Sequence, residues 1–91
     1  MIRTLVFCFN REDAYKSFCH MKENYEFTRS NKSRLELETK EQKFIFININ
    51  SGALDGLRAN SYLISEKLSK FGSQKNIQLA KYLGENATLI Y

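Results

Sequence analysis

Three cationic residues lie within one short polar turn. Arg29, Lys32 and Arg34 lie within the stretch RSNKSR, where small hydrogen-bonding side chains separate them. Arginine and lysine side chains, together with serine and asparagine, are groups that proteins commonly use to contact phosphate oxygens. The turn therefore predicts a phosphate-contacting finger at the tip of a hairpin. The alternative interpretation is a solvated surface turn, because charged residues are common in such loops.

A second polar segment precedes a short apolar run. In SGALDGLRANSYLISE, two glycines loosen the backbone of a loop before Tyr62–Ile64, which is a brief predicted strand. Arg58 and Asn60 lie in this loop, and α/β proteins place ligands beside the ends of their strands. We therefore treat Arg58 and Asn60 as candidate binding residues. In the alternative, which the local charges favour, Arg58 forms an ion pair with Asp55 or Glu66.

The same segment, about sixteen residues long, resembles the second acidic (Walker B) region of phage terminase and helicase-type P-loop ATPases. Ser51, residues 56–59 and Glu66 match the family pattern of S, then G-L-R-A-D, then a hydrophobic strand that ends in Asp-Glu. Asn60 and Ser65 stand where the family has Asp, and Ser65 takes the magnesium-binding position. The resemblance implies an α/β layer and a phage origin. The sequence has no G-x-x-x-x-G-K-[ST] loop, so we predict a reduced relative without nucleotide hydrolysis.

Few residues could hold a metal ion or react as a nucleophile. His20 is the only histidine and there is no C-x-x-C pair, so the sequence predicts neither a metal site nor a cofactor. Cys8 and Cys19 are eleven positions apart in apolar surroundings. This pattern favours buried free thiols in a reducing compartment over a disulfide.

Glu38 and Lys40 form an E-x-K at the end of a predicted strand. The arrangement resembles the active-site strand of metal-dependent nucleases in the restriction-endonuclease-like superfamily, which need a second acidic residue on a neighbouring strand. The only upstream aspartate, Asp13, lies in a predicted helix cap, so we interpret the match as accidental. A degenerate nuclease or P-loop ATPase relative is the least favoured functional class.

Runs of apolar and β-branched residues predict the strands. They lie at 2–9, on both sides of the turn 30–33, at 44–49, at 62–64 and at 87–91. The runs 2–9 and 44–49 are apolar over most of their length, which is typical of interior strands that are covered on both faces. The hairpin 26–39 alternates polar and apolar residues, so we place it at an edge of the sheet.

Two main helices are expected between these strands. Asn10 and Asp13 form a variant capping box at the start of the first helix, which ends near Asn24. Ser73 and Gly84 bound the second helix. The buried stripe of the first helix is predicted to consist of Ala14, Phe18, Met21 and Tyr25.

These elements predict one small α/β domain, a sandwich whose mixed sheet has five or six strands and carries two main helices. The central strands are expected to be parallel, because strand-helix-strand units favour that arrangement. A single hydrophobic core is expected, made of Phe7, Phe18, Ile45, Ile47, Leu63 and Leu83.

Composition limits the class of protein. The 91 residues are 43% hydrophobic and 13% aromatic, which suits one packed domain rather than a disordered chain. No apolar run approaches the roughly 20 residues of a membrane span and no secretory signal is recognised, so a cytoplasmic protein is expected. The net charge of +4 is compatible with a nucleic-acid partner.

We therefore expect a small non-enzymatic binding protein, encoded by a phage or another mobile element. Its expected partner is nucleic acid or a nucleoprotein machine in the host cytoplasm. The alternative is a protein–protein inhibitor or an oligomerising module, such as a homo-oligomer, that does not bind nucleic acid. In that case the hairpin edge or an aromatic surface would engage the partner.

Overall fold

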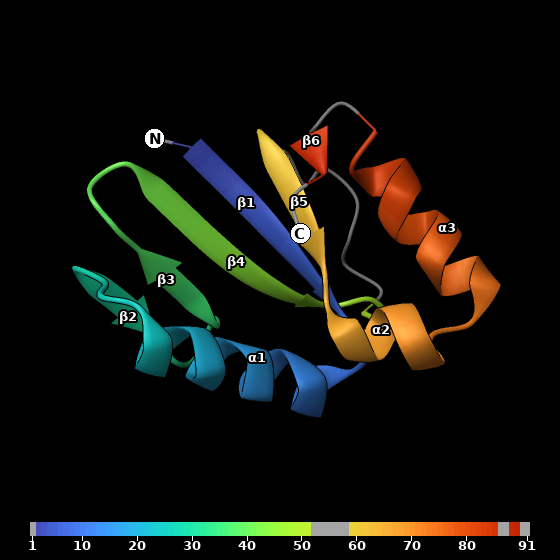
Figure 1. The fold of residues 1–91 in the computed structure, drawn as a ribbon, viewed down its shortest axis with the longest axis horizontal. Coiled ribbons are helices and arrows are strands. Elements are labelled where there is room, and N and C mark those ends of the chain that lie inside the picture. The colour runs from blue at the N-terminus through green and yellow to red at the C-terminus, as the bar shows by residue number, and fades with distance from the viewer. Residues whose placement is uncertain (1, 52–58, 86–87, 90–91) are drawn as a thin grey trace.

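The described residues, 2–51, 59–85 and 88–89, form one six-stranded mixed sheet with helices packed against it (Figure 1). The elements of this computed structural model are β1 (Ile2–Cys8), α1 (Arg11–Asn24), β2 (Arg29–Asn31), β3 (Glu36–Glu38), β4 (Gln42–Asn48), β5 (Ser61–Ile64), α2 (Glu66–Phe71), α3 (Gln74–Leu83) and β6 (Thr88–Leu89). The strand order is β2-β3-β4-β1-β5-β6. Strands β4, β1, β5 and β6 are parallel, and the β2–β3 hairpin is antiparallel at one edge. The predicted α/β fold class and the edge position of the hairpin are confirmed, but the turn of the hairpin comprises residues 32–35 and not 30–33. Residues 87 and 90–91 of the last predicted strand lie outside the described residues.

β1 is the central strand that organises the sheet. It pairs with β4 on one side and with β5 on the other, and its residues from Thr4 to Cys8 are buried. A strand covered on both faces needs apolar side chains at successive positions and not only at alternate ones, and the sequence of β1 provides them. β4 begins at Gln42, two residues before its predicted start, because Gln42 pairs with Ile2.

The core is divided between the two faces of the sheet, so the prediction of a single core was wrong. Leu5 and Phe7 belong to a cluster that α2 and α3 cover, whereas Val6 and Phe18 belong to a cluster on the α1 side. Successive side chains of a strand point to opposite faces. A sheet with helices on both faces therefore has two separate cores.

Local hydrogen bonds define the start of α1. The Asn10 side chain accepts a hydrogen bond from the Asp13 backbone N–H at 2.7 Å, which confirms the predicted cap. Ala14 and Phe18 of the predicted stripe are buried, but Tyr25 is 68% exposed, so its place in the stripe was wrong. Tyr25 has an extended backbone with φ −138° and ψ 157°. Its side chain therefore does not continue the helical spacing.

Gly84 ends α3 as predicted, but close packing explains the glycine. A Cβ atom at this position would lie 2.5 Å from the ring of Tyr62. The φ angle of Gly84 is −93°, so no left-handed conformation is required. In the parts of the chain that the structure describes, no helix is long and apolar enough to cross a membrane.

Candidate functional site

A groove of about 900 Å³ lies between the tip of the β2–β3 hairpin and the first turns of α1. The exposed cations Arg11, Lys32 and Arg34 line this groove, which we call the basic groove. The ring of Tyr15 and the apolar side chain of Leu35 line it as well. The basic groove therefore combines positive charge with aromatic and apolar surface.

Local structure brings these side chains to the basic groove. Arg11 and Tyr15 are four residues apart in α1, so they lie on one face of the helix. At the hairpin tip, Leu35 adopts a φ of 53°, a conformation that is unfavourable for a leucine. Its carbonyl accepts a hydrogen bond from the Phe46 N–H at 3.0 Å. This bond ties the hairpin tip to β4 and maintains the unfavourable conformation.

The charge balance of the basic groove is positive. Among its described lining residues, Glu12 is the one carboxylate, and it pairs with Lys16 at 2.9 Å. Hydrogen bonding to Lys16 lowers the pKa of Glu12, so the pair remains ionised and its two charges offset each other. No described carboxylate forms an ion pair with Arg11, Lys32 or Arg34. Their three charges therefore have no anionic partner among the described residues.

Arg29 does not lie on the basic groove, so the predicted finger of three cations is divided. Arg29 lies opposite Glu38 in the β2–β3 register and lines a separate pocket of about 300 Å³ that also includes Glu36. Lys43 pairs with both carboxylates, at 3.2 Å to Glu36 and 3.6 Å to Glu38. The pairing register thus places Arg29 beside the negative charges of Glu36 and Glu38, which offset its positive charge.

Asn60 lies at the opposite end of the strands from the basic groove. Its side-chain oxygen accepts a hydrogen bond from the Arg3 N–H at 2.9 Å, and its own N–H donates to the Arg3 carbonyl at 2.9 Å. These bonds join the start of β5 to the start of β1, so Asn60 has a structural role. Arg58 lies outside the described residues, as does Asp55, its predicted partner.

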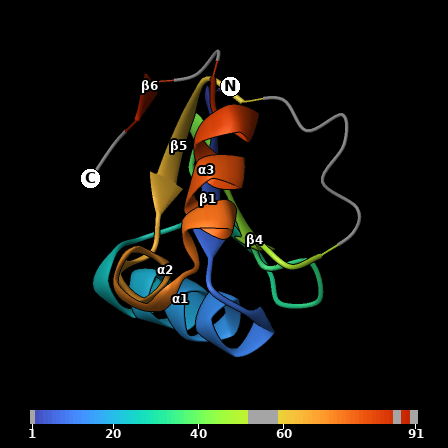
Figure 2. The same ribbon diagram turned by 90° about the vertical axis from the view of Figure 1, so that its right-hand side faces the viewer.

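Neither of the connections β1–α1 and β5–α2 leaves room for a phosphate-binding loop. The first is two residues long and the second consists of Ser65 alone. Asp13 Oδ2 accepts hydrogen bonds from the Phe9 N–H at 2.8 Å and from the Ser65 hydroxyl at 2.6 Å. The carboxylate therefore joins the first turn of α1 to the start of α2, which lies beside it (Figures 1 and 2). Glu66 of the same segment pairs with Lys70 at 2.7 Å.

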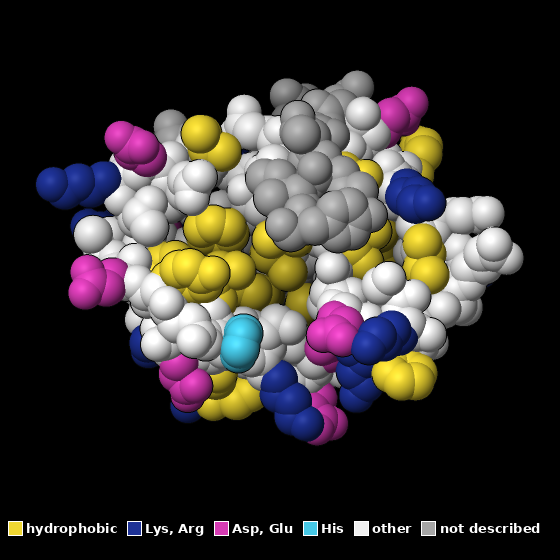
Figure 3. All heavy atoms as spheres, viewed as in Figure 1, with side chains coloured by type: hydrophobic (Ala, Val, Ile, Leu, Met, Phe, Trp, Pro, Cys, Tyr) yellow, Lys and Arg dark blue, Asp and Glu magenta, His cyan; other side chains and the backbone are white. Residues whose placement is uncertain are grey.

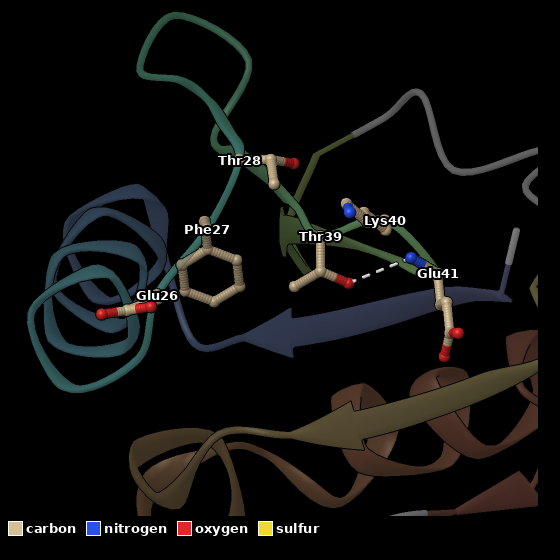
Figure 4. Close-up of a pocket in the computed structure, with 6 residues that line it drawn as sticks. All are labelled: Glu26, Phe27, Thr28, Thr39, Lys40 and Glu41. Carbon is tan, nitrogen blue, oxygen red and sulfur yellow. Dashed lines mark hydrogen bonds between the residues drawn. The ribbon is translucent and has the colours of Figure 1, made fainter.

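A smaller pocket of about 420 Å³ lies around the turn between β3 and β4 (Figure 4). Thr39 Oγ1 accepts a hydrogen bond from the Glu41 N–H at 3.3 Å, so this side chain stabilises the turn. Lys40 of the E-x-K pair is exposed here, whereas Glu38 is held by Lys43. The described residues contain no group of three or more His, Cys, Asp or Glu side chains that could hold a metal ion.

The sequence alone did not single out Arg11 or Tyr15 as site residues. One signal was available, because both positions fall outside the buried stripe of α1 that contains Ala14 and Phe18. Two exposed residues with helical spacing, one cationic and one aromatic, indicate a surface that differs from an ordinary solvated face. The neighbours of Arg11 and Tyr15 come from the β2–β3 hairpin, and the sequence of α1 does not show where that hairpin lies.

Comparisons with protein-family models, with curated proteins and with solved structures found no match. The class of the protein is therefore defined by its own fold and site. It is a small mixed α/β domain whose hairpin and first helix enclose a groove with a positive rim and an aromatic ring.

The two free cysteines should differ sharply in reactivity. Burial raises the pKa of the Cys8 thiol to about 12, and the charge of Asp13 adds to this shift. At pH 8, about one Cys8 thiol in 10,000 would be ionised, and the thiolate is the reactive form. We expect a thiol reagent to modify only Cys19 in the folded protein, and both Cys8 and Cys19 after unfolding. In a Cys19→Ser variant the fast modification should disappear; a folded variant that reacts as fast as the unfolded one would contradict this prediction.

Proposed function

We propose that this protein is a non-enzymatic binding protein that contacts the phosphate backbone of a nucleic acid through the basic groove. The observation that carries the proposal is the convergence of Arg11, Lys32 and Arg34 from two separate elements, with no described carboxylate paired to them. The biological setting we propose is that of a phage or mobile-element accessory factor in the cytoplasm, acting on nucleic acid or on a nucleoprotein machine.

Electrostatics favours a phosphate ligand for such a groove. Lysine and arginine that neutralise phosphates release condensed counterions, and this release provides most of the affinity of sequence-independent binding. The groove brings its cations to one surface, whereas the cations of the ion pairs Glu12–Lys16 and Glu66–Lys70 are already compensated. A polyanion therefore gains more from the groove than from those paired lysines.

The triple variant Arg11→Ala, Lys32→Ala, Arg34→Ala tests this proposal. We expect its affinity for oligonucleotides to fall by about tenfold or more at low salt. The slope of log K against log[salt] should become shallower by about 2 to 3, since each lost phosphate contact contributes about 0.7 to 0.9. The loss should be similar for different base sequences, because phosphate contacts do not read sequence. Binding would be measured by fluorescence anisotropy on single- and double-stranded oligonucleotides over a salt series.

A matched control removes the same charge away from the groove. Arg29, Lys40 and Lys81 are all exposed, and none of them lines the basic groove. The triple variant Arg29→Ala, Lys40→Ala, Lys81→Ala should therefore keep most of the parent's affinity and salt slope. Equal losses in the two triple variants would mean that net charge, and not the groove, governs binding.

A second candidate function, protein–protein inhibition or oligomerisation, is favoured by a different observation. Tyr25, Phe71 and Tyr82 are 68%, 70% and 71% exposed, and exposed aromatic side chains are common in protein interfaces. Figure 3 also reveals apolar side chains gathered in the centre of the face above α1, with charged side chains of both signs at the margin. If the parent binds no oligonucleotide at low salt, this second function becomes the better account.

A further inference from the structure

The ring of Tyr15 is an unexpected component of a surface that would otherwise bind only phosphates. Tyr15 is 40% exposed and lines the basic groove beside Arg11. Lys32 Nζ lies 5.6 Å from the centroid of the ring, a cation–π distance. Lys32 therefore lies over the ring in the free protein, and it must move to a phosphate before a base can stack on that face.

Phosphate recognition does not explain this ring or the apolar lining around it. A phosphate needs only positive charge and hydrogen-bond donors, which Arg11, Lys32 and Arg34 already supply. Tyr15 and Leu35 instead offer surface that a flat, weakly polar group could cover. In a nucleic acid, that group is a base, and each base has a face that can stack on an aromatic side chain.

We propose that the basic groove binds single-stranded nucleic acid, with one base stacked on Tyr15 and the adjoining phosphates on Arg11, Lys32 and Arg34. The inference rests on the proposed function and narrows it to one ligand class. In a duplex, every base is stacked between its neighbours and only the phosphates and groove edges face outward. A base can reach Tyr15 only if the strand is unpaired, so the groove should prefer single strands over duplexes.

The test compares Tyr15→Ala with Tyr15→Phe in the full chain. The ligands are oligo(dT), oligo(rU), a duplex of equal length and a sugar-phosphate oligomer that lacks bases. Tyr15→Ala should weaken binding of the single strands by about tenfold, whereas Tyr15→Phe, which keeps the ring, should bind as the parent does. Neither variant should differ from the parent on the duplex or on the oligomer without bases. The oligo(dT) and oligo(rU) arms show whether the natural strand is DNA or RNA.

Two controls separate stacking from other effects. The salt slope reports whether Lys32 still contacts phosphate once its aromatic neighbour is gone, and it should be unchanged in Tyr15→Ala. Tyr82→Ala removes a tyrosine that is 71% exposed on α3, away from the groove, and should leave binding unaltered. Because the chain contains no tryptophan, Tyr15→Trp also introduces a single indole, whose fluorescence a stacked base should quench.

The outcomes distinguish this inference from the proposed function. Equal losses of Tyr15→Ala on oligo(dT) and on the oligomer without bases would overturn the stacking inference. So would Tyr15→Ala binding like the parent while the Arg11, Lys32, Arg34 triple variant loses affinity, a result that would leave the proposed function standing. A parent that binds none of the ligands at low salt would overturn both.

Discussion

We expect Phe18→Ala to lower the free energy of unfolding by about 3–5 kcal/mol, the range for removal of a buried phenylalanine ring. Phe18 is 2% exposed and packs edge-on against Phe46, with ring centroids 5.9 Å apart. Asp13, Ala14 and Phe18 are the buried residues of α1, and Phe18 is the largest of them. The variant would leave a cavity between α1 and the sheet. For a domain whose total stability is about 5–15 kcal/mol, such a loss could leave much of the protein unfolded.

Urea unfolding, followed by circular dichroism, would measure the effect. Tyr25→Ala is the matched control, because it removes a large aromatic side chain at the end of the same helix, where 68% of it is exposed. That variant should change the free energy of unfolding by about 0.5 kcal/mol or less. If Phe18→Ala unfolded at the same urea concentration as the parent, Phe18 could not be buried between α1 and the sheet.

The second large effect is expected at Asp13, whose replacement by alanine should cost about 2–4 kcal/mol. Asp13 is 8% exposed, and its carboxylate accepts hydrogen bonds from the Phe9 N–H and the Ser65 hydroxyl. Hydrogen bonds to charged groups contribute about 1.5–3 kcal/mol each. The two losses will not add fully, because the Ser65 hydroxyl can rotate towards another acceptor. The cost should nevertheless exceed that of an ordinary helix cap, since one carboxylate joins β1, α1 and α2.

Glu12→Ala provides a control within the same helical turn. It removes the same charge from the same end of α1, but the Glu12 and Lys16 side chains are 66% and 69% exposed. An exposed pair of this kind contributes little to stability, so the variant should be nearly as stable as the parent. Asp13→Asn keeps one acceptor oxygen, so its stability should lie between those of Glu12→Ala and Asp13→Ala. Equal destabilisation by Glu12→Ala and Asp13→Ala would show that helix charge, and not the buried hydrogen bonds, explains the effect.

The sequence by itself determined the local elements of this protein. Asn10 and Ser73 identified the starts of α1 and α3, because a capping side chain bonds a backbone N–H only three residues away. The apolar runs of β1 and β4 identified two interior strands, because a strand with apolar side chains of both parities must be covered on both faces. Each of these inferences uses residues that are neighbours in the chain. The Walker B-like resemblance spans residues 51–66, of which 52–58 lie outside the described residues, and it stays a prediction.

Only the tertiary structure decided which side chains share a surface. Lys32 and Arg34 meet Arg11 and Tyr15 because the hairpin pairs with β4 while α1 packs against the same sheet. Arg29, three residues from Lys32, is placed beside carboxylates instead. The physical reason is that strand pairing and register bring together residues that are distant in the chain, and a shift of one residue would reverse every side chain of the strand. Local propensities do not specify that register, so the basic groove could not be read from the sequence.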